Sequence, residues 1–180
     1  MNYIFLTGLI GSLILITGAA WPDSEDSKYP VKSIKNWLFA IGGLVMLLYA
    51  IFGYLTGGDI FFVFLEGLIA IASVMMMLNI KDSIAGITVS AFGLIFIVWS
   101  VYLFKGYNTI FFIIGLSGVG LGYVFNMGTL RRNIALTAGS LLIALFSYFE
   151  ANWIFFWVNL FFAIFSGYYL IKGLTAKKHK

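Results

Sequence analysis

The sequence contains no cysteine, and its single histidine, His179, lies among lysines at the end of the chain. Disulfides, thiolate chemistry and cysteine-based metal sites are therefore excluded, and we expect neither a haem nor any other metal or cofactor. Only 10% of the residues are charged, against about 25% in an average soluble domain. So few charges cannot cover the surface of a soluble protein of this size. The composition thus excludes a soluble enzyme, a nucleic-acid-binding module and a disordered chain.

Hydrophobic residues make up 62% of the chain and gather in long stretches without charge. A membrane's hydrocarbon core is about 30 Å thick, and a helix needs about 20 apolar residues to cross it. The stretches are apolar on every face, unlike the alternating strands of a membrane barrel. They predict an all-α polytopic membrane protein with seven transmembrane helices, of which the sixth is the shortest. The predicted helices are 3–20, 37–56, 60–79, 84–104, 109–126, 134–149 and 152–171.

The first of these segments has two interpretations. Gly18, Ala19 and Ala20 resemble the cleavage site of a secretory signal peptide. The residues before the apolar stretch include no Lys or Arg, which a signal peptide normally carries. We therefore expect a retained transmembrane helix.

The basic residues indicate how the chain is oriented. With seven spans, ten of the eleven Lys and Arg residues lie on the side that also holds the C-terminus, and only Lys105 lies on the other. Cytoplasmic loops carry an excess of Lys and Arg. We expect a multi-pass protein of the plasma (inner) membrane, with the N-terminus outside and the C-terminus in the cytoplasm.

The sequence also contains an internal repeat. The stretch from Asn36 matches the stretch from Asn133 at an offset of 97, which becomes 93 after a four-residue gap. The first predicted helix matches the fifth at an offset of 107. The organisation we predict is a first triple-helix repeat at 1–82, a linker helix at 83–107, a second repeat at 108–173 and a basic cytoplasmic tail at 174–180. The matching pairs are Gly8 with Gly115, Gly11 with Gly118, Gly42 with Gly139, Leu44 with Leu141, Tyr49 with Phe146, Glu66 with Asn159, Ala70 with Ala163, Ile71 with Ile164, and Ser73 with Ser166.

A single linker helix gives the second triplet the same orientation as the first, so the two repeats are expected to be parallel. In this 3+1+3 plan the chain resembles the superfamily of SWEET sugar transporters, PQ-loop proteins and nicotinamide riboside transporters. Its length and helix plan resemble most a small bacterial inner-membrane family of that type. The segment 153–159, WIFFWVN, is similar to the tryptophan-and-asparagine helix of vitamin transporters.

Glu66 is the only charged side chain deep within an apolar stretch. It follows Asp59, at the predicted outer end of its helix, by seven residues, which places it about 10 Å inside. A charged acid at a helix centre costs about 2.5–3.5 kcal/mol, and such residues usually face a cavity and mark a pathway. The alternatives are a structural hydrogen bond, or a carboxyl that extends to the membrane interface.

Asn159 occupies the equivalent position in the last predicted helix. Ser73 follows Glu66, and Ser166 follows Asn159, by seven residues, so each repeat has a polar stripe along one helix face. Such a stripe can line a cavity, or it can be a packing face, since small and hydroxyl residues join membrane helices. Trp157, next to this stripe, is a further candidate pocket residue.

The resemblance implies specific roles for some of these positions. In the sugar transporters, a polar residue on the third helix of each triplet contacts substrate, and Glu66 and Asn159 match those positions. The second helix of each triplet supplies pocket residues, often aromatic, and Tyr49 and Phe146 are the equivalents here.

Together these features predict a transporter of a small polar solute, such as a sugar, vitamin or nucleoside, with a central cavity between the two repeats. The alternatives are a ligand-capturing subunit of a larger transporter and a non-transporting scaffold or interaction protein. An enzyme is not expected, because Glu66 has no intramembrane His, Asp or Lys partner. The partners we expect are the lipid bilayer and the solute, with a homo-oligomer left open and no nucleic acid.

Overall fold

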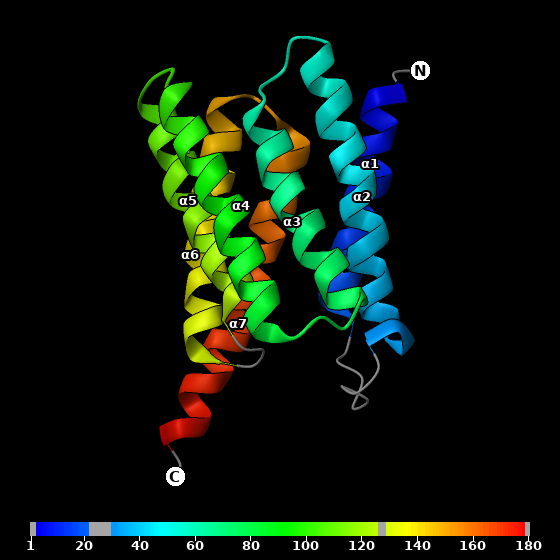
Figure 1. Cartoon of the computed structure of the whole chain (residues 1–180), viewed down its shortest axis with the longest axis vertical. Helices are drawn as coiled ribbons and strands as arrows, with labels where there is room; N and C mark the ends of the chain where they lie inside the picture. Colours follow the sequence, from blue (N-terminus) through cyan, green and yellow to red (C-terminus); the bar gives the residue numbers. More distant parts are fainter. Residues whose placement is uncertain (1–2, 22–29, 126–128, 179–180) are drawn as a thin grey trace. The chain divides into compact units, whose positions relative to one another are not determined.

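The computed structural model of the 180-residue chain describes residues 3–21, 30–125 and 129–178. Within these residues the fold is entirely helical, which confirms the all-α prediction. Seven α-helices and one short 3-10 helix, η1, follow one another along the chain (Figure 1). They are α1 (Tyr3–Ala20), η1 (Pro30–Lys32), α2 (Ile34–Leu55), α3 (Phe61–Met77), α4 (Asp82–Tyr102), α5 (Tyr107–Val124), α6 (Leu130–Phe149) and α7 (Trp153–Lys178).

The helices identify a multi-pass membrane protein. Six of those described are long and apolar enough to cross a membrane, and α3 is a shorter apolar helix of 17 residues. At 1.5 Å per residue, α3 is about 26 Å long, slightly less than the hydrocarbon thickness of about 30 Å. A helix this short is accommodated by local thinning of the bilayer or by protein around it. Nine of its residues are buried, so protein atoms surround much of it.

The prediction that the sixth helix is the shortest was wrong, because α6 has 20 residues and α3 is shorter. The Thr129 side chain accepts a hydrogen bond from the backbone N–H of Arg132 at 3.3 Å, which starts α6 at Leu130. Sequence reasoning placed Arg131 and Arg132 outside the helix because they are charged. The end of a membrane helix can lie at the interface, where long basic side chains reach water. The last helix also extends seven residues beyond its predicted end, to Lys178.

The chain divides into two compact units, Met1–Ala85 and Gly86–Lys180. In unit 1, α2 contacts both α1 and α3. In unit 2, α6 contacts both α5 and α7, so the middle helix of each triplet holds the other two together. The boundary between the units lies in the first turn of α4.

Glycines allow the first two helices of each triplet to approach closely. In unit 1, a Cβ atom added to Gly42 would lie 2.8 Å from Leu15 of α1. In unit 2, a Cβ atom on Gly139 would lie 2.6 Å from the backbone nitrogen of Val119. Both distances are shorter than van der Waals contact, so each crossing requires glycine. Small residues at helix crossings are typical of membrane proteins, where they bring backbones together.

These contacts show how the two triplets correspond. Gly11 lies against Met46, and Gly115 lies against Ile143. The equivalent residues of the second helices, Met46 and Ile143, are 97 residues apart, as the sequence predicted. The equivalent glycines of the first helices, Gly11 and Gly115, are 104 residues apart. The sequence-based offset of 107 for α1 and α5 was therefore wrong by one helical turn. In a helix rich in glycine, a slip of one turn still aligns glycine with glycine.

Burial follows the same correspondence. All four buried residues of α2, and five of the six in α1, have buried counterparts in α6 and α5. The buried residues in the described part of α7 likewise match buried residues of α3 at an offset of 93. These last pairs are Phe62 with Phe155, Leu65 with Val158, Glu66 with Asn159, and Ala70 with Ala163.

The turn that links the second and third helices is also repeated. Gly57 has a φ of 99° and Ala151 a φ of 52°, both in the left-handed region that ends many helices. In the first turn, the backbone N–H groups of Gly57 and Gly58 donate to the carbonyl oxygens of Tyr54 and Gly53. In the second, those of Ala151 and Asn152 donate to Tyr148 and Ser147, so every donor and acceptor is repeated 94 residues later. Each triplet is thus one structural unit used twice.

Candidate functional site

Glu66 is the most unusual side chain among the residues predicted to form a site. It lies in the second turn of α3 and is only 1% exposed. Its Oε2 atom has no hydrogen-bond partner within the described residues. An unsatisfied buried polar atom costs about 1–3 kcal/mol, and more if it is charged, so the position calls for a functional explanation.

Asn159 occupies the equivalent position in α7 and is 6% exposed. Its Nδ2 donates to the carbonyl oxygen of Phe155, one turn earlier, at 2.9 Å. This bond leaves the Asn159 side-chain oxygen available as an acceptor. Each repeat therefore holds a buried hydrogen-bonding side chain at the same place, and the two differ in chemistry: one is an acid and the other an amide.

The two predicted serines have different environments. Ser73 is 5% exposed and lies beside a groove between α2 and α3. Ser166 donates to the Phe162 carbonyl at 2.7 Å and accepts from the Thr137 hydroxyl of α6 at 3.0 Å. Ser166 therefore joins two helices, which is the packing role that sequence reasoning left as an alternative.

The three predicted aromatic residues are not equally placed to contact a solute. Phe146 is fully buried, and its ring lies 5.1 Å from that of Phe112, so it belongs to the core of unit 2. Tyr49 is half-buried on α2. Trp157 is 52% exposed and its ring packs edge to face on Phe156, in a row of aromatic side chains along the outside of α7.

Sequence reasoning missed Thr137 and Ala40, which decide how closely the second and third helices are joined. Ala40 lines the groove beside Ser73, and Thr137 is its counterpart at an offset of 97. The sequence did contain a signal. The repeat pairs Ala40 with Thr137, while Ser73 and Ser166 are the same residue in both copies. In the described part of the chain, no group of three or more His, Cys, Asp or Glu residues could hold a metal ion.

No protein-family model, curated protein or solved structure matches this chain.

Proposed function

We propose that the chain transports a small polar solute across the membrane, with Glu66 and Asn159 as equivalent contributions of the two repeats. The observation that carries this proposal is the buried Glu66 carboxyl, one oxygen of which has no partner in the described part of the protein. Ionisable groups inside membrane proteins usually pair with one another or lie along substrate and ion pathways. A solute hydroxyl or amino group would supply the hydrogen bond that Glu66 lacks.

The repeat supports the same proposal. Parallel repeats are a common plan of small transporters, whose substrate sites use corresponding positions of both copies. Here the corresponding positions are a carboxyl and an amide with a free acceptor. Such a pair suits a solute with several hydroxyl or N–H donors, such as a sugar, nucleoside or vitamin. A non-transporting scaffold does not need an unpartnered acid buried in an apolar helix.

Uptake into liposomes tests the proposal directly. We expect the purified chain alone to take up at least one of labelled glucose, uridine and riboflavin, and Glu66→Leu and Asn159→Leu each to reduce uptake at least about tenfold, because each removes hydrogen bonds to the solute. Thr17→Leu is the matched control, since Thr17 is an exposed α1 residue whose hydroxyl bonds to its own helix at Leu13. Absence of uptake of all three solutes would contradict transport, and full uptake by both variants would contradict the roles of Glu66 and Asn159.

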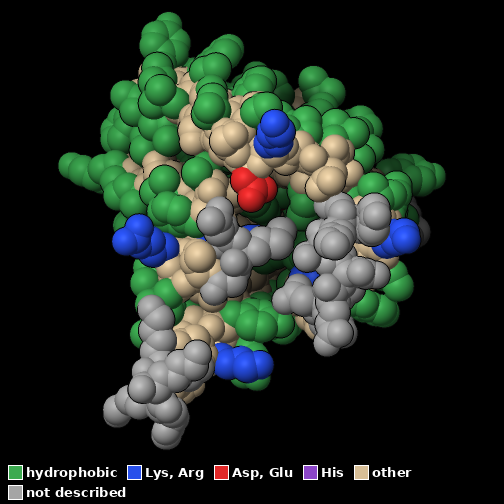
Figure 2. Space-filling view, turned by 60° about the horizontal axis from the view of Figure 1, so that its bottom comes forward, with side chains coloured by type: hydrophobic (Ala, Val, Ile, Leu, Met, Phe, Trp, Pro, Cys, Tyr) green, Lys and Arg blue, Asp and Glu red, His purple; other side chains and the backbone are tan. Residues whose placement is uncertain are grey.

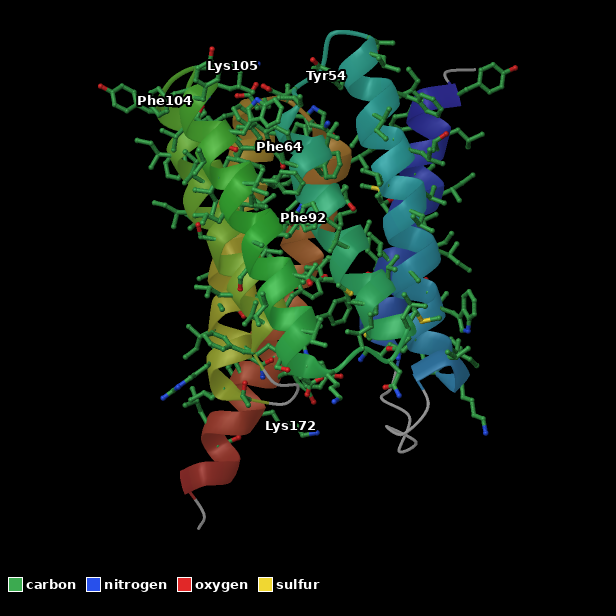
Figure 3. The ribbon with its side chains drawn as sticks, in the orientation of Figure 1. Tyr54, Phe64, Phe92, Phe104, Lys105 and Lys172 are labelled. Carbon is green, nitrogen blue, oxygen red and sulfur yellow. The ribbon has the colours of Figure 1, made fainter. Side chains whose placement is uncertain are left out.

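We also propose that the protein lies in the plasma (inner) membrane with its N-terminus outside and its C-terminus in the cytoplasm. Lys105 follows α4, and in unit 2 it lies at the opposite end from Lys172 on α7 (Figure 3). In this orientation ten of the eleven basic residues lie on the cytoplasmic side. This agrees with the excess of Lys and Arg that cytoplasmic loops usually carry.

Single cysteines test this orientation cleanly, because the chain has none of its own. An impermeant thiol reagent added to intact cells is expected to label Lys105→Cys and to spare Lys81→Cys, since α4 separates the two exposed positions. After the cells are opened, both variants should label equally, which controls for reactivity. Labelling of Lys81→Cys alone in intact cells would reverse the orientation.

A further inference from the structure

A groove of about 180 Å³ opens between α2 and α3 of unit 1. Seven of its eight lining residues are apolar, and the eighth is Ser73. Four of them are exposed on the outside of the two helices: Trp37, Leu44, Val74 and Leu78. Because α2 is apolar enough to span a membrane, apolar side chains exposed on it are suited to contact with lipid. The groove therefore suits an apolar chain.

Ala40 lines the groove where unit 2 has Thr137. At the same place in unit 2, Thr137 lies 3.0 Å from the Ser166 hydroxyl, and the two side chains join α6 to α7. In unit 1 the serine is retained as Ser73, while Ala40 has no hydroxyl to reach it. Of the positions that differ between the two copies here, this one decides whether a hydroxyl of the second helix can bond to the shared serine.

Ser73 gives the groove a hydrogen-bond donor. The side chain is 95% buried, and no hydrogen bond to its hydroxyl occurs among the described residues. Ser166, in contrast, uses its hydroxyl within α7 and toward α6. Ser73 lies four residues before Met77, the last residue of α3, and therefore about 6 Å from the helix end. An acceptor held in the groove near the membrane interface would lie within its reach.

Basic residues lie in the segments that flank the groove, with the acidic Asp82 next to one of them. Lys81 follows the lining residue Leu78 by three positions. Lys32 lies in η1, which contacts both α2 and α3 and is tied to α2 by the hydrogen bond from Trp37 Nε1 to the Val31 carbonyl at 2.8 Å. Figure 2 looks toward this end of the molecule and shows Lys and Arg side chains, together with an acidic one, among hydrophobic ones. Basic residues near a membrane surface attract the headgroups of anionic lipids.

We propose that this groove binds one anionic phospholipid. The first part of one acyl chain lies in the groove, its ester carbonyl accepts from the Ser73 hydroxyl, and the phosphate lies near Lys81 and Lys32. The site is placed in unit 1, because in unit 2 the Ser166 hydroxyl is already bonded to Thr137. It uses Ser73 but neither Glu66 nor Asn159, so it stands whether or not the chain transports.

Native mass spectrometry tests the proposal on the full chain, after exchange in mixed micelles that contain equal amounts of phosphatidylglycerol and phosphatidylcholine. We expect wild-type protein to retain one phosphatidylglycerol. Ala40→Thr should reduce retention about tenfold, because the new hydroxyl bonds to Ser73 and the side chain fills the groove. Ser73→Ala keeps the groove open but removes the donor, and should reduce retention about fivefold.

Ala138→Thr is the matched control, because it adds the same atoms at an exposed position of α6 and should retain lipid as the wild type does. Circular dichroism checks that each variant is folded. Equal retention by wild type, Ala40→Thr and Ser73→Ala would overturn the proposal. So would equal retention of phosphatidylcholine and phosphatidylglycerol by the wild type, or no retained lipid at all.

Discussion

Replacing Gly139 by alanine is expected to lower the free energy of unfolding by about 3 kcal/mol, at the upper end of what an overpacked contact costs. The added methyl group would lie 2.6 Å from the Val119 nitrogen and 2.9 Å from the Gly115 carbonyl oxygen. Both contacts are to the backbone of α5, so no side-chain rotation relieves them. The two helices must separate, and the close packing along the whole α5–α6 interface is then reduced. Thermal unfolding in detergent, followed by circular dichroism, measures the effect.

Gly167→Ala is the control for this variant, because it makes the same change on a helix of the same unit. Its added methyl group would have Thr137 as its nearest neighbour at 3.7 Å, an ordinary contact. Stability should stay the same or rise by up to about 1 kcal/mol, because alanine favours helix over glycine. If the two variants unfold at the same temperature, α5 and α6 do not cross as closely as described.

Glu66→Leu is expected to have the opposite effect on stability and to abolish uptake. Leucine resembles glutamate in volume and removes the buried oxygen that lacks a partner, so the free energy of unfolding should rise by about 1–3 kcal/mol. A site that holds an unsatisfied polar group for function commonly sacrifices stability in this way. Thermal unfolding and liposome uptake on the same preparation measure both effects.

Asn159→Leu serves as the comparison for stability. It removes a side chain whose hydrogen bond to Phe155 is already made within α7, so its stability should rise less than that of Glu66→Leu. Glu66→Gln keeps the shape and should remain folded. A clear loss of stability in Glu66→Leu would instead mean that the carboxyl makes a structural hydrogen bond, and would remove the main support for transport.

The helices and the repeat could be predicted because lipid imposes simple requirements on sequence. Long apolar stretches must be helices, since the backbone has no water to bond with. The repeat was found through the shared order of Gly42, Glu66 and Ser73 with their counterparts, because position along a helix determines which side is buried. The alignment of the α1 sequence with the α5 sequence depended on glycines spaced by three and four residues, which match at offsets one helical turn apart. Only the contacts of Gly11 and Gly115 show which of the two offsets is correct.

The candidate site was harder to predict because polar residues inside a membrane protein have two uses. Glu66 and Asn159 are buried at equivalent places, as their alignment predicted. Ser166 turned out to pair with Thr137, and no pattern within α7 alone could show this. Trp157 is 52% exposed because aromatic side chains also suit the lipid-facing surface, where their position depends on helix rotation and not on composition.

The matched burial of the two triplets means that each copy serves as an internal control for the other. Residues identical in both copies, such as Gly42 and Gly139 or Ala70 and Ala163, mark what a three-helix unit of this kind needs to pack. Pairs that differ at matched positions, Glu66 and Asn159 or Ala40 and Thr137, mark where the two copies have different tasks. Saturation mutagenesis of both copies would separate these classes, because shared packing positions should reject substitution in either copy and the differing positions in only one.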